Sequence, residues 1–252
     1  MSERASVAVV GADEEAVAGA DEGAVAAVAD AGGDPVAGPA ADVVADADFV
    51  LAVGEAALLS VARAGPAVPV LPVAAGRGVR SVPRGDLEGA VGALLAGEYD
   101  VESHPVCQIR VGDRSRATAL LDCMLVTAEP AQISEYAVHA GEELVARFRA
   151  DGVVVATPAG SSGYASRAGG PVVSPAADVL VAAPVAPFAT DADHWVLPPG
   201  DVRVSVERDV AAVDLVADDR VVGEGPPAES VLPAESLRVA VVPASGSPFR
   251  RA

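Results

Sequence analysis

The sequence predicts an α+β protein of two domains, with a small α/β Rossmann-like N-terminal domain followed by a larger antiparallel β-sandwich-like domain. Two observations lead to this fold class. Short apolar runs alternate with Ala-rich helical stretches over residues 1–100, and period-two patterns of apolar and polar residues dominate residues 101–252. The pattern leaves open that the last segment of the chain returns to the first domain.

In the first domain, we infer the strands and helices from apolar runs that end at glycine. Runs that end at Gly11 and Gly54 are typical of strands that feed a turn, and Gly32-Gly33 would stop a helix. The biased Ala/Asp/Gly segment 11–48 is expected to be an acidic, solvated helix and loop. Strands that alternate with helices predict a parallel sheet with ligands at the carboxyl ends of its strands. We expect strands at 5–10, 49–53 and 68–73, and helices at 13–31, 56–62 and 86–95.

The second domain contains many short strands with turn signals between them. Within 150–171, an apolar run typical of a buried strand opens into a loop of small residues. Regularly spaced short strands of this kind are typical of an antiparallel sandwich. Further strands are expected at 106–111, around Ala140-Gly141 within 133–148, at 202–206, around a turn at Asp218-Asp219 within 213–222, and at 237–241.

Charge and composition narrow the classes of function. The 252 residues carry 36 acidic and 17 basic side chains, for a formal charge of −19, and every basic residue is Arg. This balance argues against nucleic-acid binding through a basic surface. An acidic surface without Lys is typical of adaptation to molar salt, where a Debye length of about 3 Å screens the repulsion between acids. Aromatic residues make up only 3%, so we expect a halophilic protein whose core is built from small side chains.

Targeting and redox signals indicate a cytoplasmic protein. The N-terminus lacks the apolar run of a signal peptide, and no stretch reaches the roughly 18 apolar residues that span a bilayer. Cys107 and Cys123 have no CxxC spacing and fit reduced thiols, and the three scattered His residues suggest no metal site. We therefore expect no membrane partner and no nucleic-acid partner.

The most informative stretch for chemistry is 150–171, where the buried strand opens into a loop of Gly, Ser and Thr. Because glycine has no side chain, such a loop can bring backbone N–H groups and small hydroxyls close to a phosphate or a sugar. A plain connection between strands is the alternative, and a Gly-Ser-Ser triplet alone would favour it.

The whole run resembles the signature of the NAD kinase family, which reads approximately DG-(apolar)-TPTGSTAY-x-x-S-AGGP. Residues 119–122 resemble the family's Ala-Leu-Asn-acid segment, 184–188 its P-x-x-PH segment with Phe188 in place of His, and 196–199 its LVLPP segment. The resemblance is strong from 119 to 200 and weak before 100. In the signature itself, the matches in order and spacing are Asp151-Gly152, Thr157-Pro158, Gly160-Ser161, Tyr164 and Ala168-Gly169-Gly170-Pro171.

The resemblance implies a phosphotransferase that moves the γ-phosphate of ATP, or a phosphate of polyphosphate, to the 2′-hydroxyl of the adenosine ribose of NAD, giving NADP. It implies Mg²⁺ as a cofactor and a homo-oligomeric assembly. Such chemistry requires a carboxylate that accepts the hydroxyl proton and groups that position the phosphates. By resemblance, the catalytic residue is Glu55, and the NAD-binding residues are Gly54, Asp122, Asp151, Thr157, Gly160, Ser161, Ser162, Gly163, Tyr164 and Arg167.

The chain departs from the family pattern mainly in the segments that handle phosphate transfer. The family's Gly-Gly-Asp-Gly-Thr loop reads Val53–Ala57 here, so Glu55 carries its carboxylate one methylene further out than the usual Asp. A displacement near 1 Å can cost roughly 10²-fold in rate. The family's Gly-Ile-Asn-x-Gly segment reads Pro72–Gly76 and lacks the Asn, and Leu121 replaces the Asn of the Asn-acid pair.

Five side chains have alternative interpretations. Asp122 and Asp151 could be turn residues that bond their own backbone, and Tyr164 could be a core aromatic residue. Arg167 stands where the family has Ser, and it could clamp a pyrophosphate or occupy the pocket. Glu55 at a helix N-terminus would be stabilised by the helix dipole without any catalytic role. The sequence therefore leaves open an active NAD kinase, a non-catalytic NAD(P)-binding regulatory or accessory homologue, and a phosphotransferase with a different substrate.

Overall fold

The computed structural model describes residues 4–11, 21–111, 115–129, 132–189, 192–208, 211–224 and 228–250. The chain folds into two compact units. Unit 1 contains residues 1–104 and 237–252, and unit 2 contains residues 105–236. No helix in the described part of the chain is long and apolar enough to cross a membrane.

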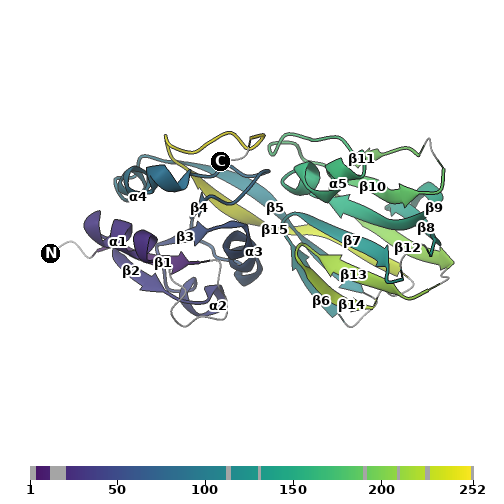
Figure 1. The fold of residues 1–252 in the computed structure, drawn as a ribbon, viewed down its shortest axis with the longest axis horizontal. Coiled ribbons are helices and arrows are strands. Elements are labelled where there is room, and N and C mark those ends of the chain that lie inside the picture. Colours follow the sequence, from purple (N-terminus) through teal and green to yellow (C-terminus); the bar gives the residue numbers. More distant parts are fainter. Residues whose placement is uncertain are drawn as a thin grey trace. The chain divides into compact units, whose positions relative to one another are not determined.

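Unit 1 is built on a parallel sheet of short apolar strands (Figure 1). In spatial order these are β4 (Val70–Val73), β3 (Phe49–Val53), β1 (Ser6–Val10) and β2 (Asp34–Ala37), and each neighbouring pair is parallel. β15 (Ala228–Val241) joins β4 in parallel where Val239 is paired with Val70. The side chains of β1, β3 and β4 are almost completely buried, as expected for a parallel sheet that is covered by helices.

Four helices pack around this sheet. α1 (Glu22–Asp30) and α4 (Leu87–Leu95) pack together over alternate residues of β1, β3 and β4, and η1 (Arg84–Asp86) leads directly into α4. α2 (Ala40–Val43) and α3 (Glu55–Ala64) pack on each other and contact the strands, α2 at β1 and α3 at β1 and β3. Asp21 caps α1, because its carboxylate accepts the N–H of Ala24 at 3.1 Å. Part of the helix expected at 13–31 lies outside the described residues.

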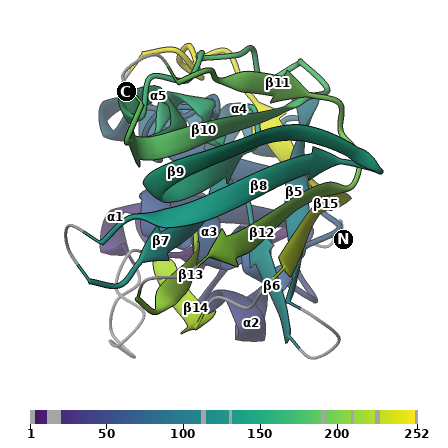
Figure 2. The same ribbon diagram turned by 90° about the vertical axis from the view of Figure 1, so that its right-hand side faces the viewer.

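Unit 2 is an antiparallel β structure (Figure 2). Its sheet runs in the order β14-β13-β7-β9-β8-β12, β10 pairs with the second half of β9, and β11 pairs with β10. β12 pairs with the part of β15 that lies in this unit, and β5 pairs with β6. The strands are β5 (Asp100–Val111), β6 (Ser115–Ala119), β7 (Asp122–Thr127), β8 (Ser134–Ala140), β9 (Glu143–Ala156), β10 (Leu180–Pro187), β11 (Trp195–Leu197), β12 (Val202–Arg208), β13 (Val213–Ala217) and β14 (Arg220–Glu224).

Strand β9 shows how unit 2 is packed. Its residues Val153 and Val155 face one large core that includes side chains of β5, β7, β8, β10, β12 and β13. Its alternate residues Val154 and Ala156 face a second cluster, which includes Ala165 of the short helix α5 (Tyr164–Arg167). This alternation follows from the period of two in a strand. β9 therefore leads from the core into the loop that begins at Thr157 and includes η2 (Gly160–Ser162).

The predicted fold class is confirmed, with an α/β unit on a parallel sheet and a larger antiparallel unit. The expectation for segment 11–48 is wrong, because this segment also contains β2 and α2. β2 is a short edge strand whose residues are exposed or half-buried, and it includes Pro35. An exposed strand lacks the apolar alternation by which strands are found in a sequence.

Candidate functional site

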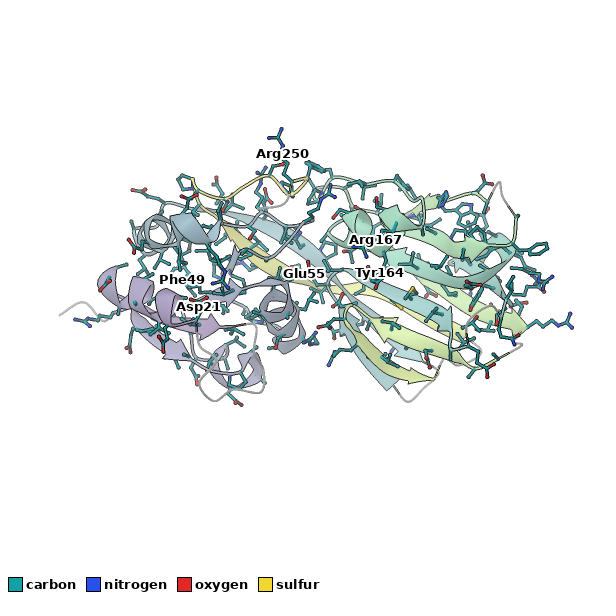
Figure 3. The ribbon with its side chains drawn as sticks, viewed as in Figure 1. Asp21, Phe49, Glu55, Tyr164, Arg167 and Arg250 are labelled. Carbon is teal, nitrogen blue, oxygen red and sulfur yellow. The ribbon has the colours of Figure 1, made fainter. Side chains whose placement is uncertain are left out.

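Glu55 is the first residue of α3 and follows the carboxyl end of β3 in unit 1 (Figure 3). Gly54 makes the turn between strand and helix with a φ of 97°, which a residue with a Cβ rarely adopts. The N–H of Gly54 donates to the carbonyl of Val73 at 2.8 Å, so the turn is attached to the end of β4. The carboxylate of Glu55 thus lies at the edge of the parallel sheet where α/β proteins bind ligands.

The loop after β4 meets Glu55. A Cβ built on Gly76, whose φ is 86°, would overlap Oε2 of Glu55, so the carboxylate lies directly over this glycine. Ala74 has a φ of 50°, an uncommon conformation for alanine, at the position where the family has Asn. The two departures from the family pattern, the 53–57 and 72–76 segments, are therefore neighbours in space.

Hydrogen bonds from two directions hold this loop. Within the loop, the hydroxyl of Ser81 accepts the N–H of Ala75 at 2.8 Å. From the C-terminal segment, Pro248 accepts the N–H of Gly78 and Gly246 donates its N–H to the carbonyl of Ser81, each at 2.9 Å. The conformation of the loop is thus imposed by its surroundings as well as by its glycines.

In unit 2, the turn 120–122 and the loop 157–163 pack against each other. The hydroxyl of Thr157 donates to the carbonyl of Leu120 at 2.6 Å, and its N–H donates to the carbonyl of Leu121 at 2.9 Å. A Cβ built on Gly160 would overlap the carbonyl oxygen of Leu121, so only glycine allows this close approach. The two sequence segments that resembled family motifs therefore form one structural element, which we call the nucleotide loop (residues 120–122 and 157–163).

Asp122 and Gly163 are neighbours in the nucleotide loop. Oδ2 of Asp122 is 3.7 Å from the position of a Cβ on Gly163, and Asp122 itself is buried. Gly163 and Ser162 are partly exposed. Ser161 differs from them, because its side chain is fully buried and its hydroxyl donates to the carbonyl of Pro158 at 2.7 Å. The same hydroxyl accepts the N–H of Val173 at 3.1 Å, so Ser161 fixes the shape of the loop.

Tyr164 and Arg167 form an exposed pair on α5, beside the nucleotide loop (Figure 3). The guanidinium carbon of Arg167 lies 5.5 Å from the centre of the Tyr164 ring, within the range of a cation–π interaction. Tyr164 is 50% exposed, which excludes the role of a core aromatic residue. Both side chains are therefore available to a ligand that approaches the loop.

Asp151 lies away from the other candidate residues of unit 2. It sits within β9, six residues before Thr157, which corresponds to roughly 20 Å along an extended strand. Its carbonyl accepts the hydroxyl of Tyr136 at 3.4 Å. The structure therefore brings together Asp122, Thr157, Gly160, Ser161, Ser162, Gly163, Tyr164 and Arg167, and separately Gly54 and Glu55, but it does not bring Asp151 to the nucleotide loop.

Sequence reasoning missed Asp218 as a functional residue and predicted only that it forms a turn. Its carboxylate accepts the backbone N–H groups of Leu120, Leu121 and Asp122. Burial raises the pKa of the Asp218 carboxyl, and these three hydrogen bonds oppose the rise. No local signal in the sequence identifies these partners, because they lie 96 to 98 residues away.

Comparisons with known proteins agree with these motifs. Residues 121–230 match the family model described as the ATP-NAD kinase C-terminal domain. The NAD kinase of Methanosarcina barkeri is 40% identical over 99 residues, which are 38% of this chain and 36% of that protein. The NAD kinase of Methanopyrus kandleri is 32% identical over 174 residues, which are 67% of this chain and 62% of that protein. The matched regions thus span about one third to three fifths of these relatives.

Two solved structures share the fold. The structure of an NAD kinase from Archaeoglobus fulgidus in complex with ATP has a TM-score of 0.75 at 22% identity, covering 98% of this chain and 94% of that one. The structure of yeast NADH kinase complexed with NADH has a TM-score of 0.69 at 18% identity, covering 84% of this chain and 66% of that one. Residues 121–230 therefore form a domain of the NAD kinase family, and the chain as a whole shares the fold of solved NAD kinases.

Proposed function

We propose that this protein is an NAD kinase that transfers a phosphoryl group from ATP or polyphosphate to the 2′-hydroxyl of the adenosine ribose of NAD. The observation that carries the proposal is the nucleotide loop, in which segments 120–122 and 157–163 pack on each other through Thr157 and Gly160. Loops in which glycine lets the backbone approach closely are suited to nucleotides. Relatives of this chain are named NAD kinases, and a neighbour in fold was solved with ATP.

Within unit 2, the accessible groups would contact NAD, and the buried groups would keep the loop in shape. Ser162, Gly163, Tyr164 and Arg167 form the first set, with Arg167 as a cation for the phosphates of the dinucleotide. The buried Asp122 lies next to this set, beside Gly163. Thr157, Gly160 and Ser161 form the second set, since their polar groups or close contacts are directed into the protein.

Within unit 1, Glu55 would act as the general base. Its carboxylate takes the proton of the 2′-hydroxyl while that oxygen forms a bond to the γ-phosphorus of ATP, and ADP leaves with the electrons of the broken P–O bond. The loop that contains Gly76 lies directly against this carboxylate, because the missing Cβ of Gly76 leaves room for Oε2 of Glu55. The protonated Glu55 returns its proton to water after the transfer.

Mg²⁺ would arrive with the phosphates of ATP. No group of three or more His, Cys, Asp or Glu side chains is placed to hold a metal within the described ranges. Mg²⁺ in kinases commonly uses one or two carboxylates together with substrate phosphates and water, which is compatible with this finding. When bound, the ion would neutralise charge that develops on the transferred phosphate.

The second candidate function is a non-catalytic, NAD(P)-binding regulatory or accessory protein. It is favoured by Ala56 and Ala57, which follow Glu55 where the family has Gly and Thr, and by the position of Glu55 at a helix N-terminus. In this case the nucleotide loop binds NAD and no phosphate is transferred.

The deciding experiment measures NADP formation by purified protein in molar KCl with NAD, ATP and Mg²⁺, together with an equilibrium titration of NAD. Glu55→Gln should reduce kcat by about 10²- to 10⁴-fold, the usual contribution of a general base, and should leave the Kd for NAD unchanged. Glu88→Gln is the matched control, because Glu88 is also an exposed acid in the first turn of a helix. NAD binding without turnover in the wild type would establish the second candidate function. Absence of NAD binding would refute both.

A further inference from the structure

Asp218, at the tip of the β13–β14 hairpin, is hydrogen-bonded to the 120–122 turn of the nucleotide loop. Oδ1 of Asp218 accepts the N–H groups of Leu121 at 2.7 Å and Asp122 at 3.2 Å, and Oδ2 accepts the N–H of Leu120 at 3.0 Å. In return, the N–H of Asp218 donates to the carbonyl of Asp122 at 2.9 Å. Four hydrogen bonds therefore join one residue to three consecutive residues that are about a hundred positions away in the sequence.

An ordinary hairpin turn does not need this arrangement. The two-residue connection at 218–219 requires a positive φ of 52° at Asp218, a conformation that glycine adopts most easily and aspartate tolerates. Glycine would satisfy the turn but would leave the three N–H groups without an acceptor. Asp218 is only 8% exposed, whereas the adjacent Asp219 is exposed. The geometry therefore assigns Asp218 a task that Asp219 does not share.

The residues that Asp218 holds are in turn bonded to the residues that would face NAD. The carbonyls of Leu120 and Leu121 accept from Thr157, and Gly160 packs on the carbonyl of Leu121. Each peptide of the turn thus has its N–H side held by Asp218 and its carbonyl side held by the 157–163 segment. A rotation of these peptides would displace both Asp122 and the 157–163 segment.

We propose that Asp218 is a positioning residue for NAD binding, which holds the 120–122 turn so that Asp122 and the 157–163 segment keep the geometry that the dinucleotide requires. This proposal rests on the proposed function, since it assigns the nucleotide loop to NAD. Asp218 touches no substrate itself and acts through the backbone of the turn. Ionisable groups near its carboxylate are the thiol of Cys107 and the carboxylate of Asp219, and its backbone is bonded to that of Asp122.

The test compares Asp218→Asn with the matched control Asp219→Asn in titrations of NAD and, separately, of ATP in molar KCl. Asn has the shape of Asp, but its NH₂ group would face backbone N–H donors, so at least one hydrogen bond is lost. Hydrogen bonds to a charged acceptor are worth at least about tenfold in an equilibrium constant. We therefore expect the Kd for NAD to rise at least about tenfold in Asp218→Asn and less than about twofold in Asp219→Asn. The Kd for ATP should stay within about twofold of the wild-type value in both variants. A general loss of folded protein would instead weaken the binding of both NAD and ATP.

Amide hydrogen exchange supplies the second readout. Faster exchange at 120–122 in Asp218→Asn, without faster exchange in β8 and β12, is expected if only the turn is released. Unchanged NAD affinity in a folded Asp218→Asn protein overturns the proposal, even if exchange at the turn is faster. If Asp218→Asn does not fold, Asp218→Glu keeps the charge but displaces it by one methylene, and unchanged NAD affinity in that variant also overturns the proposal. Failure of the wild type to bind NAD instead refutes the proposed function.

Discussion

Gly160→Ala is the sharpest single substitution for testing the packing of the nucleotide loop. A methyl group built on Gly160 overlaps the carbonyl oxygen of Leu121 and lies 2.8 Å from its Cα. Non-bonded carbon atoms pack about 3.5–4.0 Å apart, so the 157–163 segment must retreat from the turn by roughly 1 Å. The obstacle is backbone held by its own hydrogen bonds, which cannot rotate aside as a side chain could.

The magnitude of the effect follows from what this retreat disturbs. The bonds from Thr157 to the carbonyls of Leu120 and Leu121, at 2.6 and 2.9 Å, lie in the direction of the movement. We expect a loss of about 1–3 kcal/mol in the free energy of unfolding, the usual range for overpacking. A displacement of about 1 Å at a binding or reacting group can also cost roughly 10²-fold in kcat/KM.

Urea denaturation in molar KCl and the kcat/KM for NADP formation measure the two effects of Gly160→Ala, and an equilibrium titration of NAD isolates the effect on binding. Gly200→Ala is the control, because no atom lies within 4 Å of a Cβ at Gly200, and it should change none of these quantities. A Gly160→Ala protein with wild-type stability would refute the close packing of Gly160 on Leu121. A destabilised protein that binds NAD as tightly as the wild type would show that this packing has no role in recognition.

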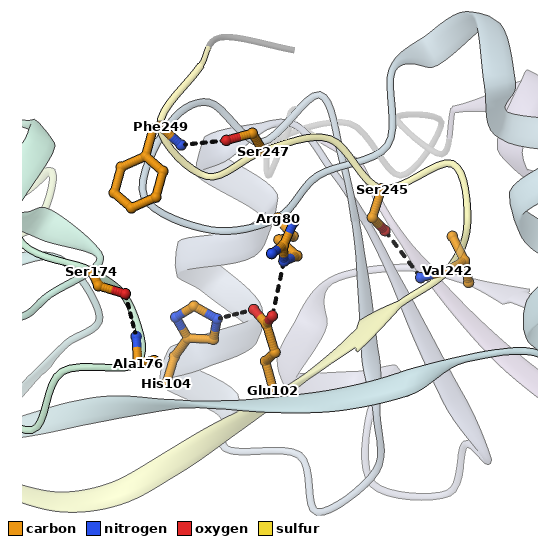
Figure 4. A network of polar contacts seen from close by, with 9 residues as sticks. All are labelled: Arg80, Glu102, His104, Ser174, Ala176, Val242, Ser245, Ser247 and Phe249. Carbon is orange, nitrogen blue, oxygen red and sulfur yellow. Dashed lines mark hydrogen bonds and ion pairs between the residues drawn. The ribbon is translucent and has the colours of Figure 1, made fainter.

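Four further substitutions test unit 1. Ala74→Asn should stabilise the protein by about 0.5–1 kcal/mol in urea denaturation, because Asn tolerates the φ of 50° better than Ala; destabilisation would mean that the loop does not hold this conformation. Gly89→Ala and Gly92→Ala in α4 should each stabilise by about 0.5–1 kcal/mol, since a Cβ at either position meets no atom within 4 Å, and a loss of stability would contradict that open space. Burial lowers the pKa of His104 from its ordinary value of 6.5, and the carboxylate of Glu102, whose Oε2 lies 3.8 Å from Nε2, opposes the shift (Figure 4). Below pH 6.5, the folded state therefore binds fewer protons than the unfolded state. As the pH is lowered through this range, the free energy of unfolding should decrease by at most about 1.4 kcal/mol per pH unit. His104→Gln should remove this dependence on pH. An unchanged slope in His104→Gln would assign the pH dependence to other groups.

The fold could be predicted from the sequence because its strands are apolar and locally bounded. The strands at Ser6–Val10 and Phe49–Val53 are buried runs that meet glycine, and their period and length identify them without knowledge of their partners. β2 could not be found in this way, because an exposed edge strand with Pro35 carries no apolar pattern. The sequence thus identifies those strands and helices whose own residues show a pattern of burial.

The sequence indicated that segments 120–122 and 157–163 carry candidate residues, but it did not indicate what each residue does. A Gly/Ser loop after a buried strand was visible, but the direction of the Ser161 hydroxyl, which is bonded inside the protein, depends on Pro158 and Val173. The distance of Asp151 from the loop could have been foreseen, since six residues of strand cover roughly 20 Å. Asp218 could be predicted only as a turn residue, because its hydrogen-bond partners are brought to it by the pairing of β13 with β7.

The backbone of the 74–78 loop keeps an uncommon conformation in unit 1. Ala74 replaces an Asn that the family uses, yet it adopts a φ of 50°, at a cost of about 1–2 kcal/mol for an L-residue with a Cβ. Such a conformation persists only where the surroundings impose it, and here the N–H of Ala74 donates to the carbonyl of Val82 at 2.8 Å while Gly78 is bonded to Pro248. The surroundings thus keep the loop in place against Glu55, whose carboxylate lies directly over Gly76.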